Sequence, residues 1–177
     1  MSKSFPRRKS PRLQGYDYSR EGAYFITICT NTRVHLLGKV ENDRMVLSDM
    51  GQIAESRWRA IPDHHPGVEL DAFVIMPNHV HGIVLIVGTG PASSATTTPD
   101  NAGVVPTPKA VLGTVIGSYK SGVTRIARRQ GLIDDSASPW QGRYHDHIIH
   151  NERRLNTLRT YIATNPARWA DDTFFTP

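Results

Sequence analysis

The sequence predicts an α+β domain with one antiparallel β-sheet flanked by helices, and three observations support this prediction. Apolar, β-branched runs of strand length outnumber the segments with helical spacing, and the two kinds of segment interleave along the chain. The reversals between neighbouring strand-like runs are short, which favours antiparallel pairing. The chain has 177 residues, of which 38% are hydrophobic, and this fits one globular domain with a single core.

The expected strands are runs rich in Val, Ile, Phe, Tyr and Thr with turn-forming residues at their ends. The run that starts at Ala23 lies between Gly22 and Asn31 and has the composition of a buried strand. Pro77 and Asn78 separate two further apolar runs, which predicts a sharp reversal between antiparallel neighbours. In chain order, strands are predicted over residues 23–30, 34–40, 44–47, 68–76, 79–87 and 144–149.

The expected helices have apolar residues at intervals of three and four positions. Ser48 and Asp49 offer N-caps for the first helix, and Pro62 limits its far end. Asn151 caps the last helix, which Pro166 stops. Helices are therefore predicted over residues 49–61, 109–131 and 151–164, and the second has one apolar face and one cationic face.

Composition divides the chain into a core and flexible pieces. Residues 1–20 are basic and interrupted by proline, so we expect an irregular N-terminal arm. Residues 21–169 form the single predicted domain, and residues 170–177 are a predicted C-terminal tail. Within the domain, residues 88–108 hold a run of threonines and four prolines with almost no charge, so a disordered loop is expected there.

The charge balance favours a polyanionic partner. The formal net charge is +5 and the sequence pI is about 9.6, which is typical of nucleic-acid binding without proving it. Cys29 is the only cysteine, which excludes a disulfide framework and a thiolate-rich metal site. No apolar run approaches the length of a membrane span, and the basic N-terminal segment lacks the apolar core of a signal peptide. A cytoplasmic protein without a membrane partner is expected.

The most informative short motif is the pair His79 and His81 at the start of a predicted strand. Side chains at i and i+2 of a strand point to the same face, so the two imidazoles lie side by side while Val80 points to the opposite face. Two neutral imidazoles form half of a divalent-cation site. The alternative is a pair of unconnected polar residues, and the apolar runs on both sides weigh against it because buried imidazoles need partners.

A second polar pair lies at the end of the last predicted helix. Tyr161 and Asn165 are at i and i+4, so a hydroxyl and a carboxamide project from one helix face. Tyr161 also follows Leu158 by three residues, which is the spacing of a core aromatic. Asn165 has an alternative role as a C-cap, because Pro166 disfavours helical dihedral angles at the residue before it. Spacing alone leaves both alternatives open.

Basic residues in two segments are candidates for contacts with DNA phosphates. A cationic helix face is often only solvated, and a basic tail can serve solubility, so each segment has an ordinary alternative. The candidates are Lys120, Arg125, Arg128 and Arg129 in the predicted helix and Arg7, Arg8, Lys9 and Arg12 in the arm.

Aromatic and histidine residues close to the last predicted strand also have two interpretations. Trp140 and Tyr144 could stack on unpaired bases, although an indole more often belongs to a core. His145 and His147 would share one face of the strand, and with His150 they raise a second metal site as a further alternative.

Several segments together resemble the REP-associated tyrosine transposases, which are single-tyrosine members of the HUH (His-hydrophobic-His) endonuclease superfamily and relatives of the transposases of the insertion-sequence-200 type. Each segment is short, but they occur in order from about residue 11 to residue 169, so the resemblance covers nearly the whole chain. The segments are residues 12–18, 24–30, 73–82, 140–141, 147–149, 161–162 and 165–166.

This resemblance implies a ferredoxin-like antiparallel sheet with flanking helices, and a helix-borne tyrosine that cuts single-stranded DNA. By position, His79 and His81 match the metal-binding pair, Tyr161 matches the nucleophile and Asn165 matches the third metal ligand. The implied cofactor is Mg²⁺ or Mn²⁺, and the implied partner is single-stranded or hairpin DNA. The resemblance leaves open a monomer or a homodimer that exchanges the tyrosine helix.

The sequence therefore predicts a metal-dependent single-stranded DNA endonuclease and strand transferase that forms a 5′-phosphotyrosine intermediate at hairpin-associated sites. The alternative is a non-catalytic DNA-hairpin-binding or regulatory protein derived from a transposase. A third hypothesis is a metal-dependent hydrolase without covalent chemistry. The presence of His79, His81 and Tyr161 together favours the endonuclease and strand transferase, since a protein that only binds DNA has no need of all three.

Overall fold

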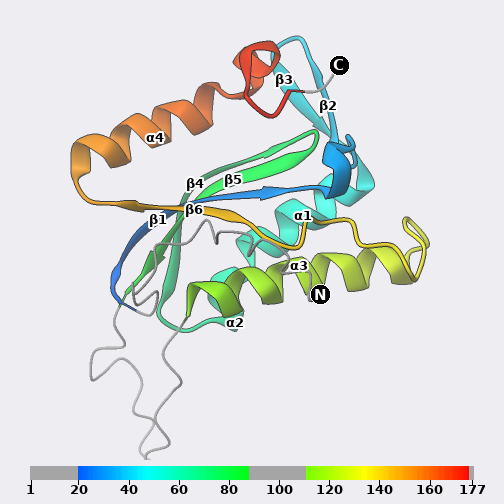
Figure 1. The fold of residues 1–177 in the computed structure, drawn as a ribbon, viewed down its shortest axis with the longest axis horizontal. Coiled ribbons are helices and arrows are strands. Elements are labelled where there is room, and N and C mark those ends of the chain that lie inside the picture. The colour runs from blue at the N-terminus through cyan, green and yellow to red at the C-terminus, as the bar shows by residue number, and fades with distance from the viewer. Residues whose placement is uncertain (1–19, 88–110, 176–177) are drawn as a thin grey trace, which may run out of the picture.

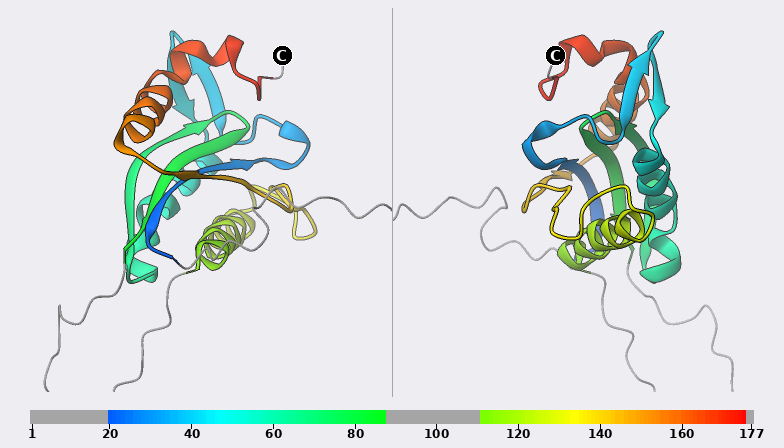
Figure 2. Two further views of the ribbon diagram at one scale, coloured as in Figure 1. Left: turned by 60° about the vertical axis from the view of Figure 1, so that its left-hand side comes forward. Right: turned by 90° about the vertical axis from the view of Figure 1, so that its right-hand side faces the viewer.

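The computed structural model describes residues 20–87 and 111–175. Within these residues, a four-stranded sheet with the order β4-β5-β1-β6 forms the centre of the molecule (Figure 1). Helices α1 (Asp49–Arg59) and α3 (Leu112–Arg129) cover one face of the sheet, and α4 (Glu152–Thr164) lies on the other face (Figures 1 and 2). The predicted α+β class and the single main antiparallel sheet are confirmed.

The sheet has the strand arrangement of a ferredoxin-like fold. Its strands are β1 (Gly22–Cys29), β4 (Val68–Met76), β5 (His79–Ile86) and β6 (His145–Ile149). Strand β1 pairs with β5 and β6, β4 pairs with β5, and every pairing is antiparallel. The turn at Pro77 and Asn78 joins β4 to β5, as predicted.

A separate two-stranded hairpin, β2 (Gly38–Glu41) and β3 (Arg44–Leu47), precedes α1. Asn42 and Asp43 between the strands have φ values of 49° and 60°, which the mirror-image turns of short hairpins require. The strand predicted over residues 34–40 is shorter than expected. Leu37 is buried, but its backbone N–H bonds to Pro77 O at 3.0 Å and its carbonyl accepts from Ser48 N at 3.0 Å, so it packs as part of a loop.

The helices match their sequence signals except at Pro62. The Ser48 side chain accepts a hydrogen bond from Gly51 N at 3.1 Å, and Asn151 Oδ1 accepts from Arg154 N at 2.9 Å, so these two N-caps are confirmed. Asp49, the other candidate cap of the first helix, is instead the first residue of α1. Pro62 does not only end a helix: it lies in the first turn of a short helix, α2 (Ile61–His64), where its missing N–H is tolerated. Two 3₁₀ segments complete the fold, η1 (Asn31–Arg33) and η2 (Pro166–Asp171).

None of the helices in the described part of the chain is both long enough and apolar enough to cross a membrane. The predictions for the basic arm, for the loop over residues 88–108 and for Arg7, Arg8, Lys9 and Arg12 fall outside the described residues.

The sheet separates two apolar clusters because side chains alternate between the faces of each strand. The larger cluster fills the space between the sheet and the pair α1 and α3, and it includes Ile26, Val80 and Trp58. The smaller cluster joins the other face to α4 through Ile83 and Ile162. Helix α4 therefore rests on a thinner apolar layer than the other two helices do.

Gly82 allows an aromatic ring to pack directly on the centre of the sheet. A Cβ atom at this position would overlap the indole of Trp58, which is fully buried on α1. Trp58 in turn contacts Tyr119 with a ring-centroid distance of 5.2 Å and Phe73 at 6.0 Å. The glycine in β5 thus has a packing role, since the aromatic group that joins α1, α3 and the sheet needs the space.

We expect Gly82→Ala to lower the free energy of unfolding by about 1–3 kcal/mol, because overpacking forces the buried indole to shift. Gly117→Ala is the matched control: Gly117 lies on the exposed side of α3 with open space around its Cα, so a small stabilisation is expected there. Urea unfolding of both variants measures the difference. Equal effects at the two positions would contradict the packing role of Gly82.

A bulge in β4 positions the residue that ties α4 to the sheet. The register shifts between Leu70 and Phe73, and both of these residues pack on the α1 side. The two residues between them occupy one place in the ladder, so Asp71 turns towards α4. Arg159 on α4 donates from Nε to Asp71 Oδ1 at 2.9 Å and from Nη2 to Oδ2 at 2.6 Å, a two-pronged contact that fixes the orientation of the helix.

The Asp71 contact predicts a pH dependence of stability. The hydrogen bonds from Arg159 hold the pKa of the Asp71 carboxyl below its ordinary value of 3.8. A carboxyl whose pKa is lowered by folding stabilises the protein above the pKa of the unfolded chain, and this stabilisation is lost as the pH falls through the folded pKa. Asp71→Asn should therefore melt below the wild type at pH 7, and the two melting curves should converge in acid. A constant difference between the proteins at all pH values would contradict this role.

Candidate active site

His79 and His81 lie side by side on the α4 face of β5. Their exposed fractions are 0% and 1%, and their ring centroids are 4.3 Å apart. Val80 between them is buried on the opposite face in the larger apolar cluster. The predicted same-face arrangement of the two imidazoles is confirmed, and both are buried deeply enough to need polar partners.

Asn78 determines which ring nitrogen of His79 carries the proton. The Asn78 Nδ2 group donates to Phe174 O at 2.8 Å and to Arg33 O at 3.3 Å, so its Oδ1 atom faces His79 Nδ1 at 2.9 Å. Because Oδ1 can only accept, Nδ1 is the protonated nitrogen of a neutral His79. The lone pair of Nε2 is then free, and this buried nitrogen has no hydrogen-bond partner among the described residues.

His81 is held on both sides of its ring. Its Nδ1 atom lies 2.9 Å from the hydroxyl oxygen of Thr27, which is the residue opposite it on β1. Phe25 stacks on the ring with a centroid distance of 5.1 Å. The second nitrogen, Nε2, lies 3.2 Å from the hydroxyl oxygen of Tyr161. The imidazole is therefore oriented towards the tyrosine by a partner on the neighbouring strand.

Tyr161 reaches the histidines because the residues around it anchor α4. Leu158 and Ile162 are buried in the apolar cluster beneath the helix, while 36% of Tyr161 is exposed. The interpretation of Tyr161 as a core aromatic therefore does not hold. Its hydroxyl contacts His81 and also donates to Asp172 Oδ2 at 3.1 Å.

Asn165, the residue that follows α4, belongs to the same site. It has φ −57° and ψ −44°, so the expected deviation from helical geometry before Pro166 does not occur. Pro166 begins the 3₁₀ segment η2, and the chain turns there without leaving helical dihedral angles at Asn165. The side chain is buried, with Nδ2 donating to Asp172 Oδ2 at 2.8 Å. Its Oδ1 atom is buried without a hydrogen-bond partner in the described part of the chain.

Asp172 is a site residue that the sequence analysis did not identify. Three side chains form a candidate metal-binding group, because each offers one ligand atom and the three atoms lie within 4.8 Å of one another. They are those of His79, His81 and Asp172. Asp172 falls in the segment predicted as a C-terminal tail, after the last strong apolar pattern. The sequence signal for Asp172 is its spacing of seven residues from Asn165. The 3₁₀ segment η2 folds the chain between these two residues, so their side chains form a hydrogen bond.

The same C-terminal segment covers the histidine pair. The ring of Phe174 lies 4.8 Å from the ring of His79 and 5.7 Å from that of His81, measured between centroids. Trp169 contacts His79 at 5.9 Å. These aromatic rings explain why the imidazoles have almost no exposed surface, although Tyr161 beside them remains exposed.

Burial shifts the pKa values of the two histidines and of Tyr161. It lowers the pKa of His79 to about 2, with help from the neighbouring His81, and lowers the pKa of His81 to about 4. Both imidazoles are therefore neutral at pH 7, which is the form that binds a metal. Burial, and secondly the charge of Asp172, raises the pKa of the Tyr161 hydroxyl to about 12, so this hydroxyl stays protonated in the resting site.

The donor set fits a divalent cation. Two nitrogen donors and a carboxylate lie within 4.8 Å of one another, and the Asn165 carboxamide contacts this carboxylate through Nδ2. Two polar atoms of the site, His79 Nε2 and Asn165 Oδ1, are buried without partners in the described residues. A buried polar atom without a partner costs free energy, so the site is more favourable when something binds there. Nitrogen and hard oxygen ligands together suit Mn²⁺ and, through the oxygens, Mg²⁺.

The structure separates the other candidate residues from this site. Lys120, Arg125 and Arg128 line one groove on the α3 side of the sheet, and Arg129 does not line it. Trp140 and Tyr144 are 4% and 8% exposed and belong to the larger apolar cluster, so neither ring is available for stacking on a base. His145, His147 and His150 are exposed on or beside β6 and form no three-residue metal group in the described part of the chain.

The fold is that of a known transposase structure. The structure of the REP-associated tyrosine transposase bound to a REP hairpin matches 89% of this chain and 73% of that chain, with a TM-score of 0.58 and 19% sequence identity. The chain therefore has the fold of the REP-associated tyrosine transposases, together with a candidate His-His metal site. No protein-family model matches the sequence.

A protein of Haemophilus influenzae (strain ATCC 51907 / DSM 11121 / KW20 / Rd) is 37% identical to this chain over 174 residues, which is 95% of this chain and 93% of the relative. The chain belongs to the same family as that protein, which is described only as an uncharacterized protein. The activity consequently has to be argued from the site.

We expect Asn165→Ala to weaken Mn²⁺ binding while leaving the melting temperature of the metal-free protein nearly unchanged. The substitution removes a buried oxygen that has no partner in residues 20–87 and 111–175, and the loss of the bond to Asp172 opposes that gain. Calorimetric titration with Mn²⁺ and thermal melting of the same variant measure both effects. His147→Ala, at an exposed histidine outside the site, is the control. Unchanged Mn²⁺ affinity in Asn165→Ala would remove this residue from the ligand set.

Proposed function

We propose that this protein is a metal-dependent single-stranded DNA endonuclease and strand transferase in which Tyr161 forms a 5′-phosphotyrosine intermediate. The proposed ligands of the Mg²⁺ or Mn²⁺ ion are His79, His81 and Asn165, and Asp172 is added to the set because of its position. The ion, when bound, would polarise the scissile phosphate and neutralise its charge. The protein is proposed to act in the cytoplasm.

The observation that carries the proposal is the distance of 3.2 Å between the Tyr161 hydroxyl oxygen and His81 Nε2. Tyr161 on α4 and His81 on β5 are 80 residues apart in the sequence, and their side chains lie within hydrogen-bond distance. A DNA-binding protein without catalysis has no requirement for a partly exposed phenol above a buried imidazole pair. Covalent catalysis by a nucleophile beside a metal site does have that requirement.

In the proposed reaction, the Tyr161 oxygen attacks the phosphorus atom and the bond from phosphorus to the 3′ oxygen breaks. The products are a 5′-phosphotyrosine and a free 3′-hydroxyl, so a second strand end can be joined without an external energy source. Since the pKa of Tyr161 is raised to about 12, its proton must leave during the attack. Asp172 Oδ2 already accepts the hydrogen bond of this hydroxyl and is the proposed acceptor of the proton.

The proposed substrate is a single strand next to a DNA hairpin, because the solved relative binds a REP hairpin. The basic residues Lys120, Arg125, Arg128 and Arg129 and the arm residues Arg7, Arg8, Lys9 and Arg12 are proposed to contact its phosphates. The histidines and Tyr161 contact one another within one chain, so a monomer is sufficient for one cleavage event, and a homodimer remains an alternative for paired events.

One observation favours the second candidate function, a hairpin-binding protein without catalysis. Phe174 lies over both histidines, and Asp172 already bonds to Tyr161 and Asn165. Cleavage therefore requires the ring of Phe174 to move away from the histidines while Asp172 stays beside Tyr161. A protein in which this ring never moved would bind DNA but would not cut it.

We expect wild-type protein with Mn²⁺ and a single-stranded hairpin substrate to form a protein–DNA adduct that survives denaturation, and Tyr161→Phe to form none. The change removes one oxygen atom and little contact surface, so the affinity for the same DNA should stay within a few-fold. Denaturing gel electrophoresis of 5′- and 3′-labelled DNA measures the adduct and identifies the strand that remains attached. Tyr144→Phe, which removes a phenol oxygen on the other side of the sheet, is the matched control and should leave adduct formation unchanged.

Phe174→Ala is the companion variant, because it removes the ring above the histidines. If wild-type protein forms no adduct and Phe174→Ala does, the proposed chemistry stands and the covering ring limits it. If neither protein forms an adduct and both bind the hairpin, the binding function replaces the proposed one. An adduct formed by Tyr161→Phe would contradict the assignment of the nucleophile, and cleavage without any adduct would indicate a simple hydrolase.

A further inference from the structure

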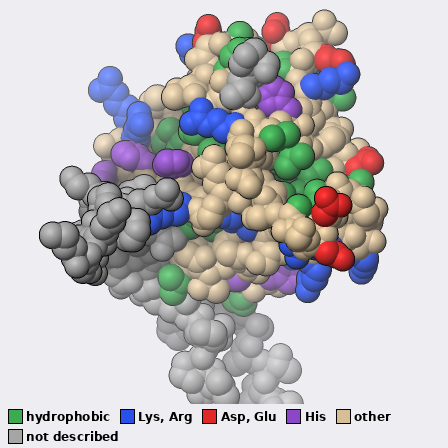
Figure 3. Space-filling model, turned by 45° about the vertical axis from the view of Figure 1, so that its right-hand side comes forward, with side chains coloured by type: hydrophobic (Ala, Val, Ile, Leu, Met, Phe, Trp, Pro, Cys, Tyr) green, Lys and Arg blue, Asp and Glu red, His purple; other side chains and the backbone are tan. Residues whose placement is uncertain are grey.

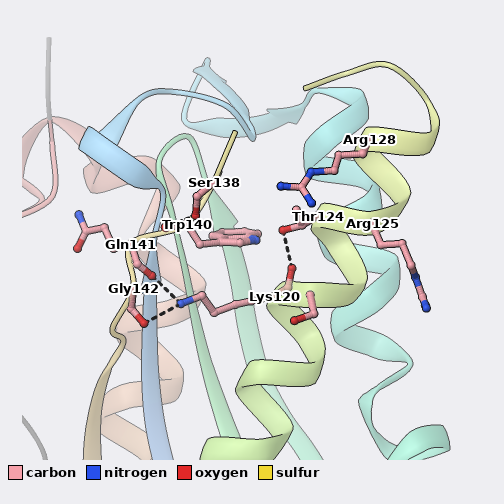
Figure 4. A pocket seen from close by; sticks show the side chains of 9 residues that line it. Lys120, Thr124, Arg125, Arg128, Ser138, Trp140, Gln141 and Gly142 are labelled. Carbon is pink, nitrogen blue, oxygen red and sulfur yellow. Dashed lines mark hydrogen bonds between the residues drawn. The ribbon is translucent and has the colours of Figure 1, made fainter. Parts of the chain in front are cut away.

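A second polar site lies on the opposite side of the sheet from the histidines. It is a groove of about 430 Å³ between α3 and the chain segment over residues 138–142, which leads into β6. Figure 4 shows the groove with Lys120 and Arg128 extending from α3 and with Trp140 reaching across from the other wall. Its volume is within the range of small-ligand sites, roughly 300–1,000 Å³.

The groove is lined by hydrogen-bond donors and cations. Among its described lining residues, none is acidic. Lys120 Nζ donates to Gln141 O at 2.6 Å and approaches Gly142 O at 3.5 Å, which leaves one of its three N–H groups. Arg125 also lines the groove, although Figure 4 shows its guanidinium directed away from Lys120. The charge in the groove is therefore concentrated at Lys120 and Arg128.

Two N–H groups in the walls have no acceptor among the residues that the structure describes. Arg128 donates from Nη2 to Ala137 O at 2.9 Å, but its Nε atom is buried without a partner in the described part of the chain. The same holds for Nε1 of Trp140, whose side chain is 4% exposed. Buried donors without acceptors are unfavourable, and a ligand that carries several acceptor oxygens can relieve them after a small shift of the walls.

The position of the groove connects it to the candidate active site. Gln141 N donates to Cys29 O at 3.0 Å, and Cys29 lies opposite His79 in the pairing of β1 with β5. Trp140 forms an isolated bridge with Thr30, the residue that follows β1. The groove and the histidine pair thus lie on the two sides of the same end of β1. A strand of DNA that passes around this end can contact both.

We infer that this groove is a phosphate site for the unpaired DNA strand that leads to Tyr161, with Lys120 and Arg128 as its cations. That the bound molecule is this DNA strand rests on the proposed function. The groove holds the backbone and not a base, because the aromatic ring in its wall is buried and presents no open face for stacking. Binding at the groove is therefore independent of base sequence.

Basic side chains are dispersed on one face of the molecule. Figure 3 shows them in several separate places on the face drawn there, and no continuous basic stripe crosses the part of that view that is not grey. The groove differs in that it holds two cations together, Lys120 and Arg128.

The first test compares two arginines on the same side of the sheet in the Tyr161→Phe background, with EDTA present so that cleavage cannot occur. Arg128→Gln removes a cation from the groove, and Arg59→Gln removes an exposed cation on α1, outside the groove. Fluorescence anisotropy with a labelled single strand of about ten nucleotides gives the affinity at several salt concentrations. Arg128→Gln should weaken binding several-fold and lower the slope of log affinity against log salt by about 0.7. Equal losses in both variants would overturn the inference.

The second test uses thiol protection and does not depend on the stability of Arg128→Gln. Cys29 is the only cysteine and is buried, so Ser121→Cys adds one exposed thiol at the groove. The oligonucleotide should slow alkylation of this thiol by a maleimide several-fold, and a strand of abasic nucleotides should do the same. Ser56→Cys, at an exposed position on α1, is the control and should not be protected. Protection by inorganic phosphate alone, at the same phosphate concentration, would indicate a small-anion site and overturn the strand assignment.

The two proposals can fail separately. Protection of the Ser121→Cys thiol in a protein that forms no adduct would support the groove and reject the nuclease. Adduct formation with no protection, and with equal effects of Arg128→Gln and Arg59→Gln, would reject the groove and support the nuclease.

Discussion

Burying two imidazoles at the end of the central strand pair costs solvation free energy, and this cost determines what surrounds them. Each Nδ1 atom has a polar partner, Asn78 for His79 and Thr27 for His81, and these partners come from the sheet and from the turn that leads into β5. With these bonds made, His81 Nε2 lies 3.2 Å from the Tyr161 hydroxyl on α4, and His79 Nε2 has no partner among the described residues. Tyr161, Asn165 and Asp172, on α4 or after it, complete the candidate site beside the two imidazoles.

The sheet divides the functional groups between its two faces. On the α4 side, a thin apolar layer holds the helix while polar groups gather at one end, where Tyr161 and Asn165 stand above the histidines. On the other side, the aromatic side chains around Trp58 fill the centre of the larger apolar cluster. The polar groove lies at the edge of this cluster, beside Trp140. The bulge in β4 serves both sides, because Leu70 and Phe73 stay in the larger core while Asp71 turns to bind α4.

The parts of the site that follow a local rule could be predicted from the sequence. The two-residue repeat of a strand places His79 and His81 on one face, and the four-residue spacing on a helix places Tyr161 and Asn165 together. The fold class and most strands also follow from local patterns. Asp172 could not be predicted in this way, because its place depends on how η2 turns the chain after Pro166. The sequence indicates only a turn at Asn78, since the direction of its carboxamide depends on backbone carbonyls at Arg33 and Phe174, which are far away in sequence.

The Asp71 contact has a consequence for how the site is assembled. Arg159 lies two residues before Tyr161, and its bond to β4 holds α4 against the sheet of the same chain. The phenol and the imidazoles therefore meet at an effective concentration that the fold sets, and dilution of the protein does not reduce it. In the structure of this one chain, the side chains of the candidate site all come from the same chain. Under the proposed function as a monomer, the activity of each molecule would then be the same in a cell that holds very few copies as in a concentrated solution.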